Sequence, residues 1–141
     1  MTANSAKQLA KLGQYLQKFC KTTDFNRVMA KAVPVACTKN TCTVELAIDT
    51  EHANTYGTLH GGLTASLVDT MTTMALVAND SPPGVSVELS VSYMRPAAVG
   101  STLLIHSEIV KLGKSMAFLT SEFRDKESGK LIATGKHIKH L

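Results

Sequence analysis

The sequence predicts an α+β fold, in which helices and antiparallel strands occupy separate stretches of the chain. Three observations lead to this prediction. Apolar residues recur at helical spacing near the N-terminus, a long apolar segment without strand alternation follows in the middle, and alternating segments fill the part after residue 84. A chain of 141 residues has the ordinary size of one domain, so we expect a single domain over 1–141, with 1–5 flexible.

The first fifty residues are expected to form two helices and a strand pair. Apolar residues from Leu9 to Phe19 fall on one face of a helix, and a shorter helix is expected after Thr23. Two alternating segments, 33–38 and 41–49, flank a two-residue turn and are expected to pair as strands.

The rest of the chain is expected to form one long helix and four strands. The segment 59–78 lacks strand alternation and suits a helix of about four turns, which turn-forming residues end after Ala78. The strands expected after it are 85–93, 102–111, 115–125 and 131–139.

Composition excludes several classes of protein. A hydrophobic content of 44% and a charged content of 18% are typical of a globular chain rather than a disordered or membrane-spanning one. The net charge of +4 and the 5% of aromatic residues are too low for a nucleic-acid-binding surface, so no nucleic-acid partner is expected. The three cysteines lack zinc-site spacing, and their odd number is typical of free thiols in a reducing compartment.

The N-terminal segment is informative about the cellular compartment of the protein. It contains no unbroken apolar stretch, so we expect no secretory signal, and no integral membrane segment follows it. Lysines without acidic residues before Asp24 are a weak feature of mitochondrial transit peptides, but an ordinary amphipathic helix explains them equally well. We therefore expect a soluble intracellular protein.

Asp69 is the one charged residue in the segment 62–78. Burying a carboxylate there costs several kcal/mol unless it is paired, hydrogen-bonded or beside a water-filled pocket. The plain alternative is that Asp69 lies on an exposed stripe with Ser66, Thr72 and Thr73. The usual solvated face of Lys and Glu is missing from this helix, which favours a functional carboxylate.

The start of the same helix suits an oxyanion. Gly61 and Gly62 allow a substrate to approach the first free amides of the helix, whose dipole favours developing negative charge. Asn54 could donate from its side-chain amide to the same carbonyl. The alternatives are tight helix–loop packing for the two glycines and a structural loop position for His60, which is a minor candidate base.

Two segments of the chain resemble the hotdog-fold acyl-CoA thioesterases. The first, residues 52–69, reads HANTYGTLHGGLTASLVD, in which an acidic residue follows eight positions after the first glycine of HGG. The second, residues 83–97, reads PGVSVELSVSYMRPA. The similarity extends from Phe25 to Leu141.

The resemblance implies a hotdog fold, in which a curved antiparallel sheet wraps around one long central helix. It also implies edge-to-edge homodimers that assemble into a homotetramer, with the active site between subunits. Asn54 and the Gly61 amide would polarise the thioester carbonyl, while Asp69 and Ser86 from the other subunit would activate water. His60 belongs to the same motif with a less certain role. Asp69 could act as general base, which we favour, or as nucleophile.

Ser86 also has a plain alternative, because it fits the alternation of 85–93 as an outward-facing polar residue. The family's nucleotide-binding positions fall on three stretches of this chain and one histidine near its end. They are Ser86, Glu88, Tyr93, Met94, Arg95, Pro96, Ala97, Ala98, Lys111, Leu112, Gly113, Lys114, Ser115, Met116 and His140.

The net positive charge lies in the C-terminal segment. Residues 111–141 contain seven basic and three acidic residues, whereas 1–110 are balanced, and we interpret the excess as a clamp for coenzyme A phosphates. Arg95, Lys111, Lys114 and His140 are the candidate phosphate partners. For any single lysine, a solvated turn or strand edge is the plain alternative.

The sequence therefore predicts hydrolysis of medium- to long-chain fatty acyl-CoA, without metal or cofactor. The alternatives are a hotdog hydratase acting on enoyl-CoA, which the HGG arrangement fits poorly, and a non-catalytic acyl-CoA-binding module, which has no evident need for Asp69. The resemblance further implies a cytoplasmic and mitochondrial location and an association with phosphatidylcholine transfer protein.

Overall fold

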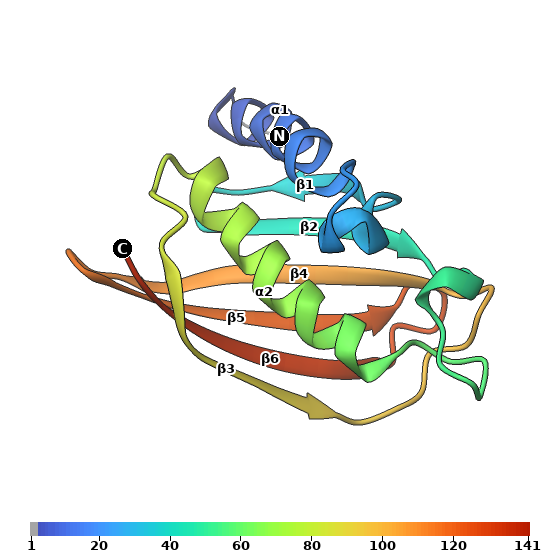
Figure 1. The fold of residues 1–141 in the computed structure, drawn as a ribbon. Helices are drawn as coiled ribbons and strands as arrows, with labels where there is room; N and C mark the ends of the chain where they lie inside the picture. The colour runs from blue at the N-terminus through green and yellow to red at the C-terminus, as the bar shows by residue number, and fades with distance from the viewer. Residues whose placement is uncertain (1–2) are drawn as a thin grey trace.

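A six-stranded antiparallel sheet forms the framework of the computed structural model, which describes residues 3–141 (Figure 1). Its order is β1-β2-β4-β5-β6-β3, so β1 and β3 are the edges. The strands are β1 Val33–Cys37, β2 Thr41–Ala47, β3 Val85–Tyr93, β4 Thr102–Leu112, β5 Met116–Asp125 and β6 Leu131–His140. The expected strands are all present, with ends displaced by no more than two residues.

The long helix α2, Gly61–Ala78, crosses the concave face of this sheet (Figure 1). The expected apolar character is confirmed, because most of its side chains are buried against the strands. Gly135 of β6 allows the close approach, since a Cβ atom there would lie 2.4 Å from a methyl carbon of Val68. A curved sheet around one central helix is the expected hotdog arrangement, and the α+β prediction is confirmed.

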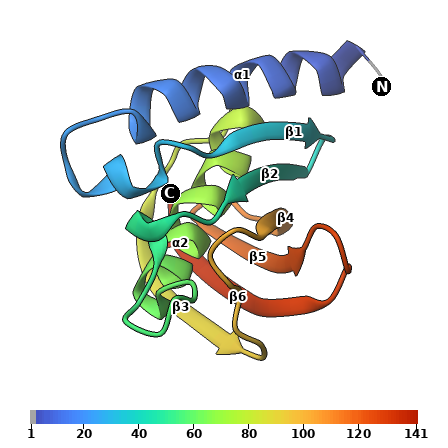
Figure 2. The same ribbon diagram turned by 90° about the vertical axis from the view of Figure 1, so that its right-hand side faces the viewer.

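The helix α1, Ala3–Cys20, packs on β1 and on the C-terminal part of α2 (Figure 2). Leu12 and Leu16 are buried as its periodicity predicts, whereas Phe19 is 38% exposed at the end of the helix. The short helix expected after Thr23 is a 3-10 turn, η1, Phe25–Met29. A second 3-10 turn, η2 Thr50–His52, lies in what was expected to be loop. Residues 1 and 2 of the segment expected to be flexible lie outside the described residues, and α1 begins at Ala3.

An irregularity in β3 changes which side chains face the helix. Ser86 pairs with Lys139 and Glu88 pairs with Ile138, so Val87 is an extra residue between them and forms a β-bulge. A bulge reverses the phase of the side chains that follow it. As a result, Ser86 lies on the same side of the sheet as Leu89 and Tyr93, facing α2.

The two long helices, α1 and α2, contain 18 residues each. Within residues 3–141, no helix is sufficiently long and apolar to cross a lipid bilayer.

Candidate active site

Asp69 lies midway along α2, with half of its side chain exposed. The stripe of polar residues considered for it is only partly present, because Thr72 is fully buried. Beside Asp69 stands His137 of β6, whose Nε2 lies 3.8 Å from the Asp69 carboxylate and which is itself fully buried. The helix therefore presents its carboxylate to a buried imidazole on one side and to open space on the other.

Ser86 reaches this cluster from β3. Its hydroxyl lies 2.7 Å from Nε2 of His137, so the outward position that simple alternation gives it is wrong. The bulge at Val87 is the physical reason, because it lets Ser86 and the apolar Leu89 share one face. Asp69 and Ser86, which the resemblance pairs, are thus brought to the same imidazole.

The hydrogen bonds of His137 determine its tautomer. The Thr72 hydroxyl donates to the Val68 carbonyl at 2.7 Å, so its oxygen accepts a hydrogen bond from Nδ1–H of His137 at 2.8 Å. Nε2 is then the acceptor, and the Ser86 hydroxyl donates to it. Burial, and next the charge of Lys139, lower the pKa of His137 below its usual value, which keeps this imidazole neutral at neutral pH.

A cavity of about 420 Å³ adjoins Asp69 along the C-terminal half of α2. Its lining comes from α1, η1, α2, the loop before β3, and β6. The lining residues are Tyr15, Phe19, Asn26, Asp69, Thr70, Thr73, Met74, Val77, Ser81, Pro83, Gly84 and Lys139. The cavity is mainly apolar, with Asp69 and Lys139 as its charged groups.

The start of α2 carries the HGG motif. Nδ1 of His60 accepts a hydrogen bond from the Gly62 amide at 2.8 Å, so His60 is the N-cap of the helix. The Gly61 amide, at the first helical position, has no partner within the helix. Of the two glycine amides, the one at Gly61 is thus available to a substrate oxygen.

Asn54 lies in the loop that leads to this helix. Its Oδ1 accepts from the amides of Tyr56 and Thr58, and its Nδ2 donates to the Thr58 hydroxyl at 2.9 Å. Asn54 therefore shapes the loop, and one N–H of its NH₂ group is left to donate elsewhere. The His60 amide donates to the His52 carbonyl at 2.9 Å, which ties the loop to the start of α2.

Comparison with known proteins identifies the family. The family model described as the Thioesterase superfamily matches residues 56–132, more than half of the chain. The chain belongs to the thioesterase superfamily.

Similar proteins cover nearly the full length of this thioesterase. Acyl-coenzyme A thioesterase 13 of Homo sapiens is 41% identical over 131 residues, which cover 92% of this chain and 94% of the relative. The crystal structure of zebra fish thioesterase superfamily member 2 has a TM-score of 0.91 and 37% identity, covering 94% and 97% of the two chains. That of the Mus musculus protein has a TM-score of 0.88 and 38% identity, covering 100% and 99%. These findings confirm the resemblance and the enzyme class.

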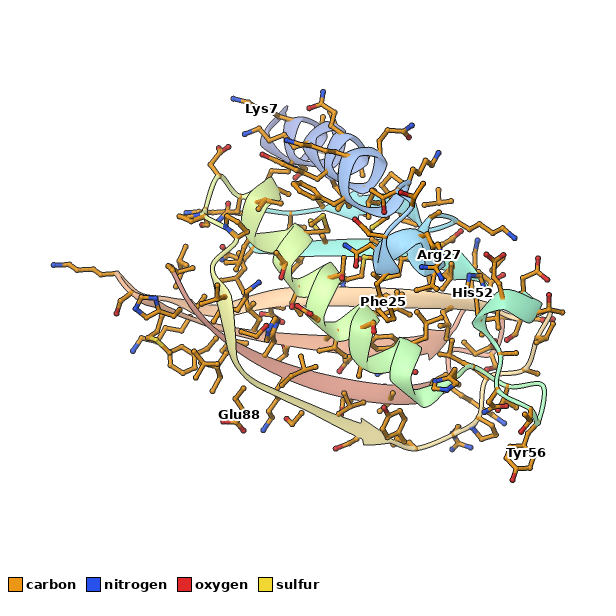
Figure 3. All side chains as sticks on the ribbon, viewed as in Figure 1. Lys7, Phe25, Arg27, His52, Tyr56 and Glu88 are labelled. Atoms are coloured by element: carbon orange, nitrogen blue, oxygen red, sulfur yellow. The ribbon has the colours of Figure 1, made fainter. Side chains whose placement is uncertain are left out.

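The candidate coenzyme A residues of this thioesterase fall into two groups at opposite ends of β3. The first, 93–98, lies beside the start of α2, where the Tyr93 hydroxyl donates to the Gly61 carbonyl at 2.6 Å. The second, 111–116, forms the β4–β5 turn, where Met116 pairs with His140 and Val85 pairs with the same residue. Figure 3 shows Glu88, on β3, at the lower left and Tyr56, in the loop before α2, at the lower right.

The basic residues of the C-terminal segment are similarly divided. Arg124 and Lys126 form ion pairs with Glu122 and Glu45. Lys111 and Lys114 are exposed at the β4–β5 turn, whereas Lys139 is buried. The basic residues of this segment therefore differ in their surroundings, and the candidate phosphate partners Lys111 and Lys114 are both exposed at one turn, beside His140.

Sequence reasoning missed His137 and Lys139. Ile138 lies between them, and a period-two pattern with one apolar residue places the apolar side chain inward. The structure does the reverse, because His137 and Lys139 face α2 and Ile138 is directed to the outer face. The sequence contains one signal for them. Two polar residues lie on either side of Ile138 in a strand that packs on an apolar helix.

Proposed function

We propose that the chain is an acyl-CoA thioesterase, which hydrolyses medium- to long-chain fatty acyl-CoA to fatty acid and coenzyme A. One observation carries the proposal: the half-exposed Asp69 carboxylate and the Ser86 hydroxyl meet at a buried, neutral His137 beside a mainly apolar cavity. The proteins of similar length named for acyl-coenzyme A thioesterase activity support the choice of substrate.

The site is assembled from two subunits in this proposal. Gly61 and Asp69 are eight residues apart on one straight helix, or about 12 Å along its axis, so they cannot act on one carbonyl within a subunit. Tyr93, at the end of β3, binds the Gly61 carbonyl, and Ser86 lies at the start of the same strand. Antiparallel pairing of two β3 strands would therefore bring Ser86 and Asp69 to Gly61 of the second subunit.

The β3 edge has the surface that such pairing requires. Val85, Val87 and Tyr93 are each more than half exposed on an unpaired strand edge, and apolar edges of this kind favour pairing with another chain. The outer face of the sheet carries a second apolar patch with Val110 and Phe118, beside a cavity of about 250 Å³. We assign the edge to a homodimer and the outer face to its assembly into a homotetramer.

The chemistry follows from the hydrogen-bond directions. Because Ser86 donates to His137, its oxygen can accept from a water molecule, and Asp69 accepts the second proton of that water. As Asp69 takes the proton, the water oxygen bonds to the thioester carbon, and the resulting oxyanion receives hydrogen bonds from Gly61 and Asn54. Collapse breaks the C–S bond, and the proton returns from Asp69 to the departing coenzyme A thiolate.

The cavity receives the acyl chain in this arrangement. It begins at Asp69 and continues between α1 and α2 past Phe19, Met74 and Val77, which offer apolar contact to methylene groups. In this proposal the exposed Lys111 and Lys114, with His140 nearby, contact the coenzyme A phosphates. The cytoplasmic and mitochondrial location and the phosphatidylcholine transfer protein association stay predictions, which cell fractionation and co-purification would test.

Asp69→Asn tests the proposal directly. We expect kcat for a medium- or long-chain acyl-CoA to fall about 10³-fold or more, because an amide cannot take the proton from water. Thiol release from saturated acyl-CoA measures turnover, and Asp80→Asn, at an exposed aspartate two residues after α2, is the control. A folded Asp69→Asn protein with near wild-type kcat would contradict the proposal.

Two further outcomes would favour the alternative functions. Hydration of enoyl-CoA without thiol release would favour the hydratase. Binding of acyl-CoA without turnover would favour the non-catalytic binding module.

A further inference from the structure

Lys139 is the only buried charged side chain among the lysines, arginines, aspartates and glutamates of the described chain. Its exposed fraction is 4%, and its Nζ donates to the Thr73 hydroxyl at 2.6 Å. Thr73 in turn donates to the Asp69 carbonyl at 2.8 Å. An ammonium group out of water costs stability unless a negative charge compensates it, so its presence here calls for an explanation.

No carboxylate compensates Lys139 by contact. Within residues 3–141, none of the ion pairs closer than 4.0 Å includes it, and its hydrogen-bond partner Thr73 is neutral. The acidic group whose charge acts on it is Asp69, and both residues line the same cavity. The ammonium is thus held one helical turn beyond the carboxylate that the hydrolysis uses.

Substrate binding changes the surroundings of Asp69. In the free subunit half of this side chain is exposed, so water solvates its charge. An acyl chain in the cavity would displace that water, and apolar surroundings disfavour a carboxylate. A buried cation keeps its effect when water leaves, because charges interact more strongly at low dielectric constant.

The other groups that face Asp69 do not supply this charge. His137 from β6 is neutral, Ser86 from β3 does not titrate, and Tyr15 of α1, across the cavity, is a phenol and cannot supply a positive charge. Among the described residues that line the cavity, Lys139 is the cation.

We propose that Lys139 is a positioning residue for hydrolysis, whose buried ammonium, held by Thr73, keeps the Asp69 carboxylate charged after the acyl chain has displaced water from the cavity. This role rests on the proposed function, because it assigns a task in the same reaction. It differs from a purely structural role, in which the Lys139–Thr73 hydrogen bond would join β6 to α2.

Lys139→Met and Lys139→Gln separate the two roles. Methionine removes charge and hydrogen bond together, whereas glutamine removes the charge and can still donate to Thr73. We expect both variants to move the acid limb of the kcat–pH profile, which reports the substrate complex, to higher pH, with about a tenfold loss of kcat below about pH 6. The matched control is Lys130→Met, an exposed lysine just before β6, which should keep the wild-type profile.

Thermal unfolding supplies a readout independent of turnover. Burial lowers the pKa of Lys139, so removing this amine should raise the midpoint of unfolding at neutral pH. The role is overturned if the Lys139→Gln variant has the wild-type kcat–pH profile. It is also overturned if Lys139→Met lowers the unfolding midpoint and loses activity only in proportion to the loss of folded protein. An active wild type with an unchanged Lys139→Met profile overturns this role alone. A wild type that does not hydrolyse acyl-CoA overturns the proposed function and the role with it.

Discussion

The residue with the most constrained surroundings is His137. It contacts Thr72 through one nitrogen and Ser86 through the other, with the Asp69 carboxylate 3.8 Å away. Since a neutral imidazole has one donor and one acceptor, these two contacts use its whole capacity. His137 thus orients Ser86 and does not itself need to exchange protons during the reaction.

Replacing His137 tests that role. His137→Phe should lower kcat about tenfold or more, because Ser86 loses its acceptor and can turn away from the water, while KM changes little. His137→Gln, whose amide can still accept from Ser86, should recover part of the loss. Steady-state kinetics with one acyl-CoA measure both variants, and equal kcat for the His137→Phe variant and the wild-type protein would remove His137 from the mechanism.

The same histidine has a consequence for stability. Its pKa is lowered in the folded protein, so the unfolded chain binds more protons as the pH falls below the ordinary histidine value of about 6.5. The free energy of unfolding should therefore decrease over that range. The decrease, measured by chemical denaturation at a series of pH values, should be smaller in His137→Gln, with the remainder due in part to His52, whose pKa burial also lowers.

At the scale of elements, the end of β3 holds the start of α2. The Tyr93 hydroxyl donates to the Gly61 carbonyl at 2.6 Å, and a Cβ atom on Gly61 would lie 3.4 Å from the Tyr93 ring. Tyr93 therefore holds Gly61, the residue whose amide is free, through its carbonyl and through contact with the ring.

Tyr93→Phe removes this hydrogen bond and keeps the ring. We expect kcat to fall about threefold to tenfold, because the helix start loses a restraint on the direction of its free amide. The melting temperature should change little, since Tyr93 is largely exposed. Tyr56→Phe, at an 89% exposed tyrosine in the neighbouring loop, is the control. A KM increase with unchanged kcat would assign Tyr93 to coenzyme A binding instead.

The elements themselves follow from local pattern to a large extent. The apolar segment before residue 79 predicts α2, because a helix buried on most sides needs apolar residues all round. The bulge at Val87 could not be predicted in the same way. The residues 85–93 alternate without a break, and the phase change depends on the pairing of β3 with β6.

At the scale of the whole molecule, one subunit carries two incomplete half-sites. Asn54 and Gly61 lie at one end of α2, and Asp69 and Ser86 lie about two helical turns further along. Mixed assemblies test whether these halves combine across subunits. Refolding an equal mixture of Asn54→Ala and Asp69→Asn chains should restore about a quarter of wild-type kcat, because half of the dimers would contain one intact site.

The mixing experiment distinguishes a site shared between two subunits from a site within one chain. Each variant refolded alone should be nearly inactive, and size-exclusion chromatography should show the same assembly for all three samples. Activity of the mixture no higher than the mean of the two variants would show that the four residues act within one chain.

The sequence by itself determined the α+β class, the order of the strands along the chain, the apolar central helix and the two ends of its motif, Gly61 and Asp69. These follow from periodicity and from residue types whose chemistry is local. The tertiary structure decided that Ser86 faces inward, that His60 caps the helix, and that His137 and Lys139 are buried beside Asp69. These depend on strand pairing and on packing between distant segments, because a side chain's burial is set by what lies across from it rather than by its neighbours in the chain.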